Sequence, residues 1–223
     1  MIGIIILIVT VVTFLGIGAW ALVKILRGPD FPKGYKFSAV VGGKTATIIV
    51  DKDLPSIKNK ISNETEAWIV DGKIMQAKDV AEKCAVAMIA TETIFHNRKI
   101  TKASRPHVIF LFKTNKNFEA GGDVGMWSDD NLKHVAAYSV ELSGIFGTKR
   151  VDMVVIRTDY LSTIAEKGQP AVHELIHVLN KAATGDYSSD HTDPNLWLGP
   201  GGKTSIEGEA TVKWTELVQT LTK

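Results

Sequence analysis

Two histidines and a glutamate at a fixed spacing are the residues of this chain best suited to chemistry. His173, Glu174 and His177 form the pattern H-E-x-x-H within the stretch PAVHELIHVLNKAAT. Residues four apart on an α-helix lie one turn above each other, so the two imidazoles would face one point in space and could chelate a metal ion. Glu174 would lie at their flank, where a carboxylate can reach a water molecule without being a ligand itself. The spacing therefore predicts a metal site with an adjacent general base.

The element that must position these side chains is a helix over residues 170–184. Pro170 suits the first turn, because its missing N–H would have no partner there, and Gly185 suits a left-handed C-cap just past the end. A chance pair of histidines on an ordinary amphipathic helix is the alternative. Apolar residues at helical spacing would bury one side of the helix and hold the imidazoles in place: Val172, Leu175, Ile176 and Leu179.

A catalytic zinc ion usually takes three protein ligands and keeps one position for water. The segment after the helix, GDYSSDHTDPNLWLGPGG, is rich in turn-forming residues, so the chain should turn back there with its polar side chains exposed. We expect His191 to be the third ligand, because a neutral imidazole binds zinc well, with Asp193 as the second choice. Glu207 and Glu209 are further alternatives, although acidic residues are favourable in the first turn of a helix without any metal.

The stretches HELIHVLN and HTDPNLWL resemble the zincin metallopeptidases, and within them the metzincins. The family pattern is H-E-x-x-H-x-x-G-x-x-H, often followed by Asp-Pro and a hydrophobic residue. The resemblance covers about the last 60 residues by motif and the middle of the chain by element order. It implies zinc ligation by His173 and His177 and a general-base role for Glu174.

The chain departs from the family pattern after the first half of the motif. Asn180 stands at the family's glycine position and Ala183 at its third histidine, and His191 comes eight residues later. No methionine occupies the place of the family's Met-turn, where Trp197 is nearest. The third ligand is therefore expected to be displaced along the chain.

If the site forms, the expected reaction is hydrolysis of a peptide bond. Zinc would lower the pKa of a water molecule and polarise the substrate carbonyl, while Glu174 would take the proton and pass it to the leaving amine. Tyr187 is a candidate donor for the oxyanion. An extended peptide could pair with an edge of the sheet, at the strand over residues 133–142 or the one over 151–157.

The N-terminus predicts a membrane anchor. The run from Ile2 to Val23 is uncharged, apolar and long enough to cross a bilayer as a helix, and Lys24 follows it directly. We expect a single-pass anchor over residues 1–27 that contacts lipid through residues 2–26. A cleaved signal peptide is the alternative. The positive-inside rule places the domain in the cytoplasm by default, and export or a virion membrane would reverse this.

After a linker over residues 28–33, one zincin-like domain is expected over 34–223. Turn signals at Gly42-Gly43 and Asp71-Gly72 predict two hairpins, and helical spacing predicts a helix over 79–96 that Asp79 could cap. A long surface loop is expected over 117–131. Further strands are expected over residues 107–112, 133–142 and 151–157, followed after the H-E-x-x-H helix by a C-terminal helix over 205–221. This order predicts an α/β (α+β) fold in which helices pack on a twisted mixed sheet.

Composition narrows the function classes. A net charge of +2 over 223 residues, without clusters of basic and aromatic residues, argues against a nucleic-acid partner. The single cysteine, Cys84, rules out an intrachain disulfide and is expected to be a buried, inert thiol. The sequence thus favours a membrane-anchored, Zn²⁺-dependent endopeptidase. The rival hypothesis is a non-catalytic membrane-anchored binding or structural protein, such as a virion or envelope component.

Overall fold

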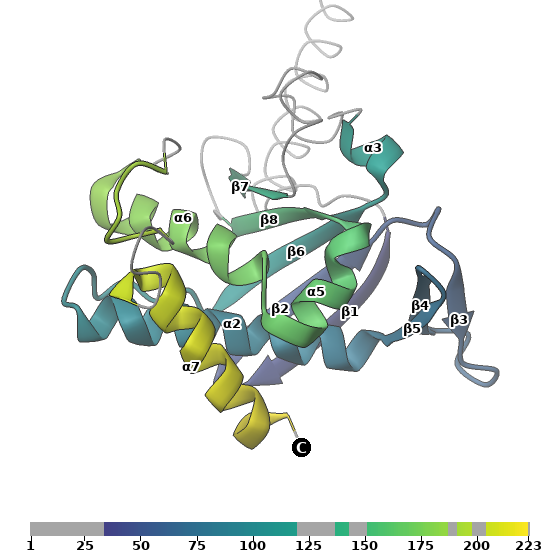
Figure 1. Ribbon diagram of the computed structural model, residues 1–223. Coiled ribbons are helices and arrows are strands. Elements are labelled where there is room, and N and C mark those ends of the chain that lie inside the picture. Colours follow the sequence, from purple (N-terminus) through teal and green to yellow (C-terminus); the bar gives the residue numbers. More distant parts are fainter. Residues whose placement is uncertain (1–33, 120–136, 143–150, 187–190, 198–203, 223) are drawn as a thin grey trace, which may run out of the picture. The chain divides into compact units, whose positions relative to one another are not determined.

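The computed structural model describes residues 34–119, 137–142, 151–186, 191–197 and 204–222 (Figure 1). Contacts divide the chain into two compact units, and nearly all of the described residues belong to the unit made of Pro32–Val140 and Asp152–Lys223. This unit is mixed α/β, with a five-stranded and a three-stranded sheet and several packed helices. The predicted class, helices packed on a mixed sheet, is confirmed.

The five-stranded sheet consists of β1 (Tyr35–Val41), β2 (Lys44–Val50), β6 (His107–Lys113), β7 (Ala137–Leu142) and β8 (Val151–Arg157). Its strand order is β1-β2-β6-β8-β7. The first two strands form an antiparallel hairpin, whose turn at Gly42 and Gly43 has positive φ at both residues, as a two-residue turn of this kind requires. β2, β6 and β8 run parallel to one another.

In the parallel part of the sheet, buried side chains lie side by side on neighbouring strands. Ile48 lies beside Phe110, and Phe110 lies beside Val154. These three side chains are fully buried and belong to the same apolar cluster as the helices, so this face of the sheet is the one that the helices cover. The opposite face of the same strands is buried too, through Ile49, Ile109, Leu111, Met153 and Val155. Burial on both faces explains why β6 reads as a continuous apolar run.

Four helices gather along one face of the sheet (Figure 1): α2 (Ala77–Asn97), α5 (Leu161–Lys167), α6 (Ala171–Thr184) and α7 (Ile206–Leu221). The long helix α2 contacts the other three and also β1 and β2. Its Cys84 is fully buried, as predicted, and burial raises the pKa of the thiol. Trp214 of α7 donates a hydrogen bond from Nε1 to the carbonyl oxygen of Lys83, 3.1 Å away. The other three helices therefore pack against α2.

The smaller sheet is antiparallel and consists of β3 (Ser56–Lys58), β4 (Thr65–Val70) and β5 (Lys73–Gln76). Trp68 and Met75 lie opposite each other on β4 and β5, and both are buried in the main apolar cluster. The predicted hairpin at Asp71-Gly72 is thus confirmed, and it is packed on the core through one side.

Several sequence expectations need correction. The helix predicted over 79–96 begins at Ala77 with Gln76 as its N-cap residue, so Asp79 is not the cap; it lies in the first turn, 3.0 Å from the Lys83 ammonium. Residues 117–119 belong to a short helix, α3 (Asn115–Glu119), and not to a loop. β8 lies between β6 and β7, so it is not an edge strand. β3, α5 and the 3₁₀ turn η2 (Thr158–Tyr160) were not predicted.

Within the described ranges, the helices are too short or too polar to cross a bilayer. The predicted anchor over residues 1–27 and the linker over 28–33 lie outside the described residues. The same is true of most of the predicted loop, from residue 120 to residue 131, and of residues 133–136, the beginning of the strand predicted over 133–142.

Two glycine caps allow a matched test of how the segment before α6 packs. Gly168 caps α5 with φ 72°, and Gly185 caps α6 with φ 86°. A Cβ at Gly168 would lie 2.6 Å from the Trp214 ring, whereas one at Gly185 would meet nothing within 4 Å. We expect Gly185→Ala to lower the free energy of unfolding by about 1 kcal/mol through left-handed strain alone. Gly168→Ala should lower it by about 2–4 kcal/mol, because overpacking adds to that strain. Urea unfolding measures both, and equal losses would contradict the packing of Trp214 on Gly168.

Candidate metal centre

Helix α6 carries the H-E-x-x-H motif and is held by its apolar side. It begins at Ala171 after a cis Gln169–Pro170 bond and ends at the left-handed Gly185, whose N–H donates to the carbonyl oxygen of Lys181. The C-cap prediction is confirmed, and Pro170 is the N-cap residue. The residues expected to bury the helix are all buried in the main apolar cluster: Val172, Leu175, Ile176 and Leu179. The opposite side of α6 is left to carry His173 and His177.

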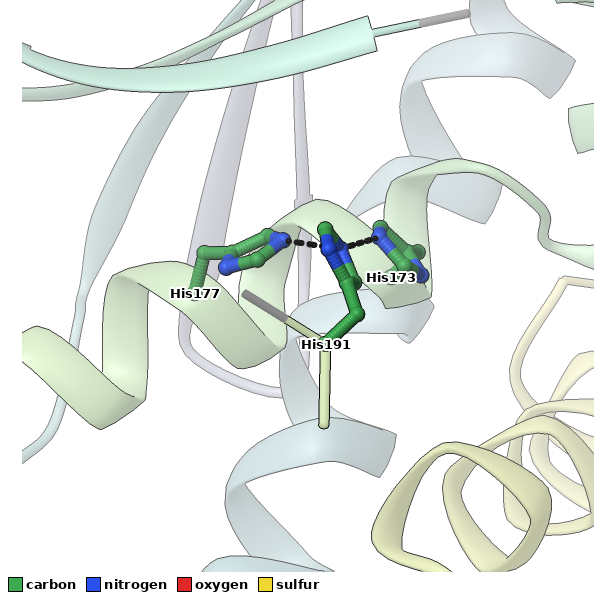
Figure 2. Close-up of side chains that lie close together, drawn as sticks. All are labelled: His173, His177 and His191. Atoms are coloured by element: carbon green, nitrogen blue, oxygen red, sulfur yellow. Dashed lines mark hydrogen bonds between the residues drawn. The ribbon is translucent and has the colours of Figure 1, made fainter. Parts of the chain in front are cut away.

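Three imidazoles converge at this helix. His173 and His177 point from successive turns of α6 toward His191, which comes from the segment after the helix (Figure 2). The Nε2 atom of His191 lies 3.0 Å from Nε2 of His173 and 3.2 Å from Nε2 of His177. One ring nitrogen from each residue lies within 4.8 Å of the others, so the three side chains are close enough to bind one metal ion. We call His173, His177 and His191 the histidine cluster.

The spacing of the histidine cluster fits a small ion. Two nitrogens that bind one tetrahedral zinc at 2.0–2.1 Å lie about 3.3 Å apart, close to both of the Nε2 distances at His191. The exposure of the cluster is graded: His177 is buried, His173 is partly buried and His191 is exposed. An ion held here would therefore be fixed by a rigid helix on one side and reachable from solvent on the other.

His191 immediately precedes a tight turn. Its backbone is left-handed, with φ 51°, which is unfavourable for a residue with a Cβ and is typical of functional sites. Just downstream, Asp193 accepts hydrogen bonds at Oδ1 from the N–H and the side-chain amide of Asn195, at 2.8 and 2.9 Å. The N–H of Trp197 donates to the carbonyl oxygen of Asp193. These bonds fold residues 193–197 into a compact turn.

The indole ring of Trp197 packs against all three rings of the histidine cluster. Its ring centroid lies 4.7 Å from that of His173, 4.5 Å from that of His177 and 4.6 Å from that of His191. The side chain is 5% exposed, and its Nε1 is buried without a hydrogen-bond partner among the described residues. One rigid indole thus contacts all three imidazoles and limits their rotation.

His173 has a second polar partner on its far nitrogen. Its Nδ1 lies 3.0 Å from Oε1 of Glu207, in the first turn of α7. Burial by itself lowers the pKa of His173, but the hydrogen bond to Glu207 and the charges of Glu174 and Glu207 outweigh it, so the pKa is raised. Glu207 thus lies beside the His173 ring, on the side away from the three converging nitrogens.

Glu174 is buried next to the cluster. Its side chain is 4% exposed, and Ser139 of β7 lies with Oγ 2.7 Å from Glu174 Oε2 and 2.9 Å from the Glu174 carbonyl oxygen. Burial raises the pKa of Glu174 to about 7, and the charge of His173 and the hydrogen bond from Ser139 only partly offset that rise. An acid poised in this way can exchange a proton near neutral pH.

Among the described residues, the other predicted ligands are not part of the histidine cluster. Asp193 is engaged in its turn, and Glu209 pairs with Arg98 at 2.7 Å. Glu207 lies on the Nδ1 side of His173, as described above. Tyr187, the predicted oxyanion donor, lies outside the described residues.

Sequence reasoning missed the contacts that support the cluster. A lone serine in a strand, such as Ser139, carries no signal of its own. Trp197 was noted only as the residue nearest the place of a Met-turn. Glu207 was considered as a ligand or as a favourable acidic residue in a first helical turn, and not as a hydrogen-bond partner of His173. Its position in the first helical turn is confirmed, two residues after Ser205, which caps α7 by accepting a hydrogen bond from the N–H of Gly208.

Metal titration of two variants tests which residue completes the site. His191→Ala should lower the affinity for a divalent metal ion by at least about 100-fold, because one of three nitrogen donors is lost. Asp193→Asn keeps the acceptor that folds the 193–197 turn but removes the carboxylate, and should leave the affinity nearly unchanged. Isothermal titration with Zn²⁺ measures both. A large loss in Asp193→Asn together with none in His191→Ala would reverse the assignment.

The centre combines three converging nitrogen donors, a buried acid beside them and one face open to solvent. Comparisons of the chain with protein-family models, with characterised proteins and with solved structures found no match. The three histidines are close enough to bind one metal ion, and a buried carboxylate lies beside them.

Proposed function

We propose that this protein is a membrane-anchored, zinc-dependent endopeptidase of the zincin type. The observation that carries the proposal is the convergence of His173, His177 and His191 beside the buried carboxylate of Glu174. Structural zinc sites are closed by four protein ligands, whereas catalytic sites have three and an open position. Three histidines, one of them exposed, match the catalytic kind.

The donor set supports zinc as the ion. Imidazole nitrogens are good ligands for Zn²⁺, and the two Nε2 distances at His191 are close to those of a tetrahedral site. A bound zinc ion would act as a Lewis acid and lower the pKa of a water molecule toward neutrality. Trp197 and Glu207 restrain the rings that would hold it.

Glu174 would carry the proton. As the general base it takes a proton from the attacking water and returns it to the amine that leaves when the peptide bond breaks. Ser139 orients the carboxylate by donating to Oε2. The same hydroxyl can instead donate to the Glu174 carbonyl oxygen, which would leave the carboxylate free to accept from water.

The position of β7 supports an extended peptide as substrate. β7 is the last strand in the order of the described sheet, and its Ser139 contacts Glu174. A peptide that added to this strand by main-chain hydrogen bonds would pass the general base. The membrane part of the proposal rests on the apolar run from Ile2 to Val23.

A glutamate-to-glutamine pair tests the role of Glu174. Glu174→Gln should reduce cleavage of a broad peptide mixture by about 10²–10⁴-fold, because the proton acceptor is lost while the shape of the side chain is kept. Zinc content should stay at that of the wild type. Glu166→Gln, at an exposed residue that pairs weakly with Lys73, is the matched control and should keep full activity. Cleavage followed by mass spectrometry, beside zinc content by elemental analysis, reads out both variants.

Chelation gives the complementary test. Removing the ion with a strong chelator should abolish cleavage, and adding back Zn²⁺ should restore it. Full activity in Glu174→Gln would contradict the proposed mechanism. Stoichiometric zinc with no turnover in the wild type would instead support the rival hypothesis of a binding or structural protein.

A further inference from the structure

We propose that Glu207 is a positioning residue of the metal centre, which fixes His173 in the tautomer that presents the Nε2 lone pair to the ion. This inference rests on the proposed metal site and adds to it one residue that is not among the three ligands. Its physical basis is the contact between Glu207 Oε1 and His173 Nδ1, at 3.0 Å.

The tautomer follows from the donor and acceptor properties of the two groups. A neutral imidazole has one N–H and one lone pair, while an ionised carboxylate can only accept. The proton of neutral His173 is therefore drawn to Nδ1, facing Glu207. Nε2 is left as the lone-pair nitrogen, and it is the atom that faces His191, 3.0 Å away.

Glu207 is itself held firmly. The residue is 6% exposed, and its N–H donates to the carbonyl oxygen of Leu196 at 3.0 Å. The preceding residue, Ile206, donates in the same way to Asn195, at 2.8 Å. Ser205 caps the helix by accepting from Gly208. The backbone of Glu207 is thus bound to the same turn that carries Trp197, and its buried side chain lies against His173.

Direct ligation by Glu207 fits the geometry less well. Its Oε1 lies on the Nδ1 side of the His173 ring, whereas the converging nitrogens lie on the Nε2 side. Among the residues that the structure describes, the group of side chains close enough to share one ion consists of the three histidines without Glu207. A carboxylate that accepts from the far nitrogen of a metal-binding histidine orients the ring and raises its basicity.

Glu209 offers a matched control from the same helical turn. Its carboxylate accepts two hydrogen bonds from Arg98, at 2.7 and 3.3 Å, so removing it deletes a charge of the same sign close by without touching His173. Losing an outer-shell partner of a ligand typically lowers metal affinity by about 10–100-fold. Glu207→Ala should therefore weaken zinc binding by that factor, and Glu209→Ala should change it by less than about threefold.

Nitrogen-15 NMR of the metal-free protein reads the tautomer directly. At alkaline pH, where imidazoles are neutral, long-range proton–nitrogen spectra distinguish Nδ1–H from Nε2–H rings. Wild-type His173 should be the Nδ1–H form, assigned by comparison with His173→Ala. Glu207→Ala should shift it toward Nε2–H, while Glu207→Gln, whose amide oxygen can still accept, should largely keep the wild-type form. Competition with a chromophoric chelator measures the Zn²⁺ affinity of the same samples.

The outcomes separate this inference from the proposed activity, because neither readout uses peptide cleavage. An Nε2–H tautomer of His173 in the wild type would overturn it, and this spectrum decides the matter even if Glu207→Ala fails to fold. Equal zinc affinities in folded Glu207→Ala and Glu209→Ala would overturn it as well. A wild-type protein with the Nδ1–H tautomer but no affinity for zinc would leave the tautomer assignment standing and refute the proposed function.

Discussion

The burial of one side of α6 is the constraint on which the rest of the structure depends. Val172, Leu175 and Ile176 pack into the main apolar cluster, and their burial fixes the rotation of the helix. Because His173 and His177 lie one turn apart, that rotation directs both imidazoles to the same point. A helix free to turn about its axis would carry the motif but could not keep both ring nitrogens facing His191.

Segments far apart in the sequence converge on this helix. β7 contributes Ser139 to Glu174, the segment after α6 contributes His191, and α7 contributes Glu207 to His173. Trp197 packs against all three rings of the histidine cluster. The C-terminal helix therefore belongs to the centre as much as α6 does, since it holds both Glu207 and, through main-chain bonds, the turn of Trp197.

Local sequence signals predicted the elements, and non-local contacts explain what they missed. The β-rich runs on either side of Gly42-Gly43 were enough to predict the β1–β2 hairpin, and Pro170, Gly185 and the helical spacing of apolar residues were enough to predict α6. His191 was found because a zinc site needs a third donor and the downstream segment offers a histidine. The contacts of Ser139 and Glu207 could not be predicted in this way, because their partners lie 35 and 34 residues away and only the packed fold brings them together.

The most direct test of the account is the position of a bound metal ion. Crystals of the protein grown with Zn²⁺ and measured on both sides of the zinc absorption edge should show one anomalous peak. The peak should lie about 2.0–2.1 Å from Nε2 of His173, His177 and His191, with the carboxylate of Glu174 nearby but not bound to it. A peak ligated by Glu207 or Asp193 in place of His191, or no peak at the histidine cluster, would contradict the account.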